Sequence, residues 1–147
     1  MKLSDMVAKK TGLPDGFSGS RMKWDEISEP FEIVKAAILS RPLVAENGEV
    51  ILFEQGPKAG QPIPDRQLVL QIRTKSGKSI IVRTNSPRLV PLFTADLDAQ
   101  EPVGKNQYGD DIYAVEAPEG MVRFVAFNYP YKNGKKGDVA DLEEVEE

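Results

Sequence analysis

The strongest constraint on the fold is a pair of short segments with alternating hydrophobicity, residues 67–74 and 78–84, separated by a turn at residues 75–77. A period of two places successive side chains on opposite faces of a β-strand. The apolar residues that share one face are Leu68, Leu70, Ile72, Ile80 and Val82. Two such strands around a glycine-containing turn predict an antiparallel hairpin with one face in the core and the other face mixed polar.

Residues 31–39 (FEIVKAAIL) form an apolar segment that fits either a helix or a strand. Apolar residues occur on both strand faces, as in a strand buried on both sides, and periodicity alone does not separate the two structures. We favour a strand, because the segment runs into a hairpin signal at Asn47-Gly48, which is flanked by further apolar residues.

Three other segments follow from turn and cap residues. A short helix is expected over residues 3–12 near the N-terminus, and residues 54–66, rich in Gly and Pro, indicate a long exposed loop. A second short helix or helical turn through residues 88–90 is expected to begin with Ser86 as N-cap and Pro87 at the first helical position, and Pro91 keeps it short.

Residues 111–117 and 121–131 predict a second hairpin, around a Pro-Glu-Gly turn. Several short strands with one brief helix after the central hairpin are typical of a small closed or half-open barrel. We therefore expect a mainly β fold with minor α content, a single Greek-key β-barrel of OB-fold type over residues 31–131. Residues 1–30 form an N-terminal extension with a short helix, and residues 132–147 form a basic and then acidic tail, which is expected to be disordered.

Composition removes several classes of chemistry. The 147 residues include no histidine and no cysteine, which excludes a His general base, a Cys nucleophile, disulfides, and zinc or iron-sulfur sites built on these residues. No P-loop, GxSxG or GxGxxG motif is present, and Pro64-Asp65 lacks the second carboxylate and the lysine of a PD-(D/E)xK nuclease. We expect a protein that is not an enzyme, needs no cofactor, and has neither a membrane span nor a secretory signal, which favours the cytoplasm.

The negative charge is concentrated at the C-terminus. The last ten residues hold six of the 23 acidic residues and none of the 19 basic ones, so residues 1–137 carry 17 acids against 19 bases. The six acids are Asp138, Asp141, Glu143, Glu144, Glu146 and Glu147. Such a tail is predicted to recruit protein partners or to compete with an anionic ligand for a basic surface, although it also simply aids solubility in many proteins.

The last predicted strand, VRFVAFNYPYK, carries the first candidate site. Alternation places Val122, Phe124 and Ala126 towards the core and the other set towards solvent. That other set consists of Arg123, Val125, Phe127, Tyr129 and Tyr131; the candidate site is its arginine and aromatic residues together with Lys132, which follows. Exposed rings offer bases a stacking surface and cations hold phosphates, which suits single-stranded nucleic acid. The alternative is that the aromatic residues are part of the core.

The central hairpin carries the second candidate site, formed by Arg73, Lys75, Lys78 and Arg83. The corresponding strands and loops of an OB-fold form its usual binding groove. The alternative is that these charges only keep the tip of the hairpin solvated.

Residues 17–93, with the core "FEIVKAAIL…LVLQIRTKSGKSIIVRTNSPRLVPLF", resemble the small single-stranded DNA-binding proteins of bacteriophages and prophages, which also have an opening strand, a hairpin and a short helix. The resemblance covers about half of the chain. The acidic end is similar to the tails by which such proteins recruit replication and recombination enzymes, but it ends in Val145-Glu146-Glu147 where the bacterial form has a hydrophobic Pro-Phe tip. The resemblance implies an OB-fold and sequence-nonspecific binding of single-stranded DNA, and the alternative is a protein-interaction module, such as a phage inhibitor of a host enzyme or a virion accessory protein.

Overall fold

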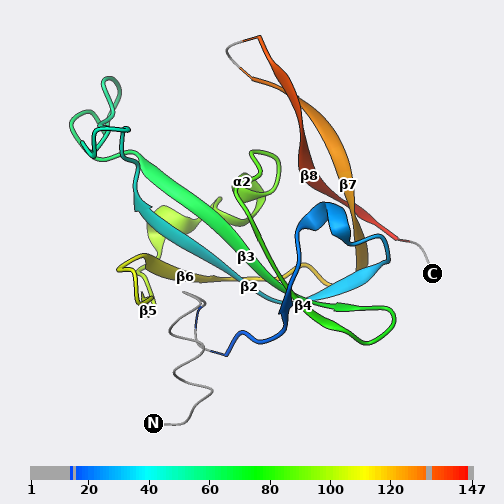
Figure 1. The fold of residues 1–147 in the computed structure, drawn as a ribbon. Coiled ribbons are helices and arrows are strands. Elements are labelled where there is room, and N and C mark those ends of the chain that lie inside the picture. Colours follow the sequence, from blue (N-terminus) through cyan, green and yellow to red (C-terminus); the bar gives the residue numbers. More distant parts are fainter. Residues whose placement is uncertain (1–13, 15, 132–133, 146–147) are drawn as a thin grey trace.

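A computed structural model describes residue 14, residues 16–131 and residues 134–145 (Figure 1). Within them, one curled sheet forms a half-barrel with the strand order β1-β4-β3-β2-β6-β5, while β7 pairs with both β2 and β8. The strands are β1 (Ser20–Arg21), β2 (Phe31–Pro42), β3 (Pro64–Thr74), β4 (Ser79–Thr84), β5 (Gly104–Lys105), β6 (Asp111–Val115), β7 (Met121–Pro130) and β8 (Lys136–Glu144). The helical turns are η1 (Trp24–Glu26), α2 (Val90–Phe93) and η2 (Leu97–Ala99).

The prediction of a mainly β fold is confirmed. The sheet is an open half-barrel with a mixed strand order. All strand pairs are antiparallel except β1 with β4, which is parallel. The helix expected over residues 3–12 lies outside the described residues. Among the residues that are described, no helix is long and apolar enough to cross a membrane.

The central hairpin forms as the alternation predicts. β3 and β4 pair with Leu70 opposite Val82, and the side chains on their shared face have no exposed surface or almost none. We call this side of the sheet the core face; its main residues are Phe31, Ile33, Ile38, Leu68, Leu70, Ile72, Ile80 and Val82. Fully burying an aliphatic side chain of this size contributes about 1.5–3 kcal/mol, so this face supplies most of the hydrophobic stabilisation.

The ambiguous segment is a strand, β2, and both of its faces are buried. Its other side belongs to a second apolar cluster, formed by Ala37, Leu39, Val69, Ile81 and Ile112, with Phe17 packed against it. We call this side the second face of the sheet. Burial on both sides explains why the sequence shows apolar residues at nearly every position of β2 and why its period is ambiguous.

The second predicted hairpin is wrong, because β6 and β7 do not pair with each other. Both lie along the same long strand instead: β6 pairs with residues 36–40 of β2, and β7 pairs with Phe31 and Glu32. The register of β2 against β3 shifts between Ile33 and Lys35, and such a bulge bends a strand and increases its twist. The bend separates the two stretches of β2, so that β7 leaves the half-barrel to form a second ribbon with β8 (Figure 1).

The disordered tail is also wrong for the described residues 134–145. Residues 136–144 form β8, which pairs antiparallel with β7 over its whole length. Val139 and Ala140 are buried, and Leu142 packs against the core. These apolar residues drive the pairing, although the acids between them make the segment look like a solvated tail.

A helical turn follows Ser86 as expected, because the backbone N–H groups of Leu89 and Val90 donate to its carbonyl at 3.2 and 3.0 Å, but the helix α2 begins only at Val90. It spans Val90–Phe93, with Pro91 in its first turn, and Ser86 lies before it without being its N-cap. The Ser86 hydroxyl accepts a hydrogen bond from the backbone N–H of Arg88 (3.2 Å) and donates one to the backbone carbonyl of Ala140 (2.6 Å). Buried Ser86 therefore joins this turn to β8.

The segment between β2 and β3 contains the expected turn. Gly48 has a φ of 85°, which favours glycine, and Val44 bridges to Val50. The exposed loop predicted over residues 54–66 is shorter than expected, because β3 already begins at Pro64.

Candidate nucleic-acid interface

The aromatic residues predicted on one face of the last strand lie on the β7–β8 ribbon. Tyr129 and Tyr131 contact each other edge to face, with ring centroids 5.0 Å apart, and Tyr131 remains 42% exposed. Gly137, opposite Tyr129 on β8, leaves room for this arrangement, because a Cβ at that position would lie 3.3 Å from Cε2 of Tyr131. We call Tyr129 and Tyr131 the tyrosine pair; Lys136, opposite Pro130, brings a cation to the same end of the ribbon.

Phe127 lies on the same face but is covered by an arginine that sequence reasoning missed. The guanidinium carbon of Arg88 is 4.0 Å from the centroid of the Phe127 ring, a cation–π contact. Arg88 also donates hydrogen bonds to Oδ2 of Asp141 at 3.2 and 3.3 Å. Phe127 therefore contributes to the packing of the ribbon. A base can reach its ring only if the Arg88 guanidinium moves away, or it can stack on the guanidinium instead.

Arg123 forms an ion pair with Glu143, the residue directly opposite it on β8. Together with Asp141, this places two acids of the expected tail against two arginines of the aromatic face. The acids that were predicted to compete for a basic surface therefore contact that surface as members of a folded strand.

The cations of the central hairpin do not form one cluster. At its tip, Arg73 is ion-paired with Glu32 across β2 and β3. Glu29 accepts hydrogen bonds from the hydroxyl and backbone N–H of Ser76, and Lys78 adds a favourable charge interaction. The hydrogen bond from the Ser76 hydroxyl, followed by that from the Thr74 hydroxyl and that from the Ser76 backbone, lowers the pKa of Glu29 from 4.5 to about 2. Acids therefore balance much of the positive charge at this tip, where Lys75 and Lys78 also lie.

Residues 16–18 cross the second face between Arg73 and Arg83. The ammonium of Lys35 donates to the carbonyl of Gly16 (2.7 Å), and the N–H of Ser18 donates to Oε1 of Gln71 (3.0 Å). Gln71 lies between the positions of the two arginines along the sheet. The groove expected along β3 and β4 is thus interrupted.

Arg83 lies instead near Arg21 and Arg41 at one end of the second face, and sequence reasoning missed both of these arginines. The signal for Arg41 was present, because it continues the alternation of Ala37 and Leu39 along β2. Arg88 left no such signal, since its contact with Phe127 depends on how the turn before α2 packs against β8.

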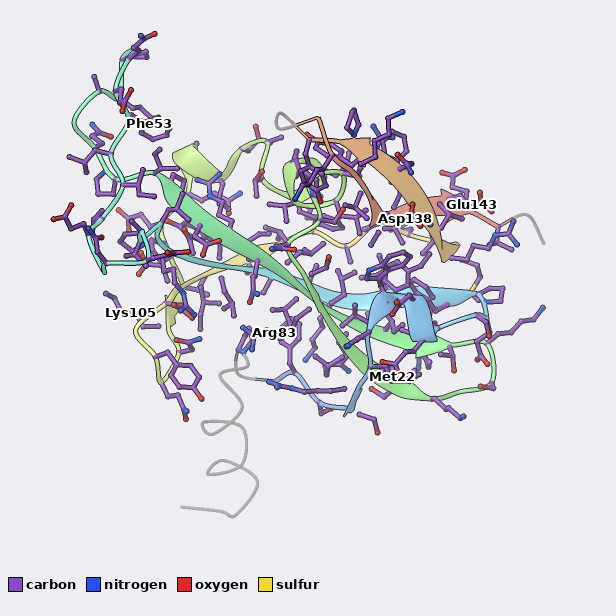
Figure 2. All side chains as sticks on the ribbon, turned by 45° about the horizontal axis from the view of Figure 1, so that its top comes forward. Met22, Phe53, Arg83, Lys105, Asp138 and Glu143 are labelled. Carbon is purple, nitrogen blue, oxygen red and sulfur yellow. The ribbon has the colours of Figure 1, made fainter. Side chains whose placement is uncertain are left out.

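The expected partner-binding acids fall into different environments. Glu143 and Glu144 line a cavity of about 720 Å³ between α2, residues 114–119 and β8. Its wall also contains Leu92, which is 67% exposed. Asp138 is exposed on the β7–β8 ribbon (Figure 2). Three other predicted site residues, Lys132, Glu146 and Glu147, lie outside the described residues.

A metal centre has no support within residues 14–145 as far as they are described, because no three carboxylates gather there. No protein-family model, curated protein or solved structure matches the chain.

Proposed function

We propose that the protein binds single-stranded DNA without sequence specificity and without catalysis, in replication or recombination of the phage type in the cytoplasm. The observation that carries this proposal is the tyrosine pair, two adjacent rings on one strand face, with Phe127 and the guanidinium of Arg88 further along the same face. An open sheet with a central hairpin and a following helical turn also supports kinship with OB-type barrels, although the strand order is mixed.

The binding mode follows from the groups on the ribbon. A base stacked on Tyr131 or Tyr129 contributes about 1–3 kcal/mol, and every base has a face that can stack, so binding tolerates any sequence. Phosphates of the same strand would take hydrogen bonds from Arg123 and Arg88, which now bind carboxylates of β8. Binding then replaces the carboxylates of β8 with phosphates at these two arginines. The carboxylates compete with the DNA and so lower its affinity.

The test is fluorescence anisotropy of labelled oligo-dT with the full chain at two salt concentrations. We expect log K to fall linearly with log salt, and Tyr131→Leu to weaken binding by about 1–3 kcal/mol with little change in melting temperature. The matched control is Tyr108→Leu, which removes another exposed tyrosine away from the ribbon. Absence of oligo-dT binding at low salt would refute the proposal. An equal loss of affinity in both variants would show that the tyrosine pair is not the stacking site.

A second candidate function, a protein-interaction module, is favoured by the cavity beside α2. Apolar side chains, among them Phe93, Val122 and Leu142, line it together with five acids and no basic residue. The acids are Asp96, Glu116, Glu119, Glu143 and Glu144. Such a lining suits a partner segment with an apolar anchor and positive flanking charges. If this is the function, Leu92→Ser would abolish capture of such a partner and leave oligo-dT binding unchanged.

A further inference from the structure

The end of the second face that carries Arg83 contains a small cavity, away from the β7–β8 ribbon. Its volume is about 200 Å³ and its wall is formed by Leu39, Arg41, Asp65, Gln67 and Arg83. In Figure 2, Arg83 lies on one side of the sheet, whereas Asp138 and Glu143 lie on the other. A water molecule takes about 30 Å³ in the liquid, so the cavity has room for a phosphate group.

Both arginines of the cavity are held in place by hydrogen bonds. The guanidinium of Arg41 donates to Oδ2 of Asp110 at 2.7 Å, and the Asp110 side chain is only 3% exposed. Asn106 donates to the same oxygen at 2.9 Å. Arg83 donates to Oε1 of Gln67 at 2.7 Å. Each guanidinium has five N–H donors in a fixed fork, so these contacts orient the group and leave further donors for a ligand.

The positive charges of Arg83, Arg41 and Arg21 lie close together at this cavity, where Arg83 is partly buried. Burial lowers the pKa of Arg83, and the positive charges of Arg21 and Arg41 lower it further, while Asp110 acts in the opposite direction. Asp65, the acid of the cavity wall, is exposed and stands opposite Arg41 on β3. Cations that repel one another in a fixed hollow are stabilised when an anion binds between them.

We propose that this cavity is an oxyanion site that binds a phosphate group through Arg83 and Arg41, with Arg21 adding favourable charge. The phosphate is either a free phosphate or mononucleotide or a diester of a nucleic-acid backbone, since both present the same oxygens to the arginine forks. The site is independent of the tyrosine pair, because it lies on the other side of the sheet and uses different residues.

The experiment is calorimetric titration of the full chain with inorganic phosphate at low ionic strength, with thymidine as the ligand without phosphate. We expect phosphate to bind and thymidine not to bind. Arg83→Gln should weaken phosphate binding by about tenfold or more, as the loss of a charge-assisted pair implies. Arg73→Gln, which removes the same charge from the far end of the same face, should change it less than about twofold.

A second variant, Arg21→Gln, decides the outcome if Arg83→Gln does not fold, because Arg21 is exposed and does not line the cavity. Arg21→Gln should weaken phosphate binding measurably, and more so at low salt. Competition between phosphate and oligo-dT would identify the bound group as a backbone diester, and independent binding would identify a free phosphate; both outcomes support the site. No heat with phosphate, or equal losses in Arg73→Gln and Arg83→Gln, would overturn it. Tyr131→Leu should leave phosphate binding intact, which separates this proposal from the one made for the ribbon.

Discussion

Truncation after Gly137 removes most of β8 and should destabilise the whole fold. Val139 is buried and lies opposite Phe127 in the ribbon, and Leu142 packs on the core opposite Phe124. Full burial of such side chains contributes about 1.5–3 kcal/mol each, so a buried Val and a half-buried Leu give about 3 kcal/mol. This is a large part of the 5–15 kcal/mol that is typical for a domain, and it corresponds to about 6–12 °C in melting temperature.

The assay is urea and thermal unfolding followed by the emission of Trp24. This ring lies edge to face with Phe124 of β7, at a centroid distance of 6.5 Å, so it reports directly on the ribbon. A truncated chain with the stability of the full chain would refute the reasoning, because it would mean that β8 does not contribute to the fold and that the end of the chain is the solvated tail its composition suggests.

The matched control is the double substitution Asp141→Asn and Glu143→Gln, which keeps β8 and removes two of its charges. Partly exposed ion pairs such as those with Arg88 and Arg123 contribute about 0.2–1 kcal/mol each, so the stability should change by less than about 2 kcal/mol. Affinity for oligo-dT should rise in this variant, most at low salt, because the Debye length is about 30 Å at 0.01 M and about 10 Å at 0.1 M. Unchanged affinity at both salt concentrations would contradict competition by β8.

Three further predictions concern single residues. Arg41→Gln leaves the carboxylate of Asp110 buried without its cation and should lower the free energy of unfolding by about 1–3 kcal/mol, measured in urea. The pKa of Glu29 is lowered to about 2 in the folded state, so its contribution to stability is present above about 4.5 and is lost as pH falls towards 2; Glu29→Gln should flatten the stability–pH profile in that window, and an unchanged profile would exclude Glu29 as a cause. Gly19→Ala should destabilise the chain by about 1–3 kcal/mol, measured as a lower melting temperature, because φ is 143° there and a Cβ would lie 2.7 Å from the carbonyl oxygen of Ser79.

Local patterns were sufficient for β3, β4 and β7, because consecutive residues of each strand show the alternation or the apolar content of a strand. For β2 the apolar content fitted a helix equally well, and the hairpin signal that follows it was needed to favour a strand. Local patterns failed for β8, where Val139, Ala140 and Leu142 are spaced among acids and charge dominates the composition. They also failed to predict that β7 pairs with β2 and β8. This pairing depends on a bulge near Val34, and no glycine, proline or other turn residue in the sequence indicates that bulge.

The parts of the candidate site that lie on one strand could be predicted from the sequence, whereas the contacts between distant segments could not. The alternation of β7 placed Tyr129 and Tyr131 on one face, where they contact each other, but it also placed Ala126 towards the core, and Ala126 is exposed because β7 has left the half-barrel there. Strand alternation could not show that residues 16–18 cross the second face or that Arg88 covers Phe127, because both contacts come from connecting segments whose paths depend on tertiary packing. Nor could it show which cations have acidic partners, since pairs such as Arg73 with Glu32 join residues far apart in the chain.

The position of β2 at the centre of the sheet has a consequence for the order in which the chain folds. β2, β3 and β4 follow one another in sequence and pair as neighbours, so they can form a three-stranded meander before the rest of the chain arrives. One edge of β2 stays unpaired until β6 and β7, which come much later in the chain, have docked along it. Contacts between such distant segments slow folding, because a long loop must close before they are made. During synthesis the meander would emerge from the ribosome with one edge of the apolar strand β2 exposed. Pairing of β6 and β7 along that edge would then protect the chain from aggregation.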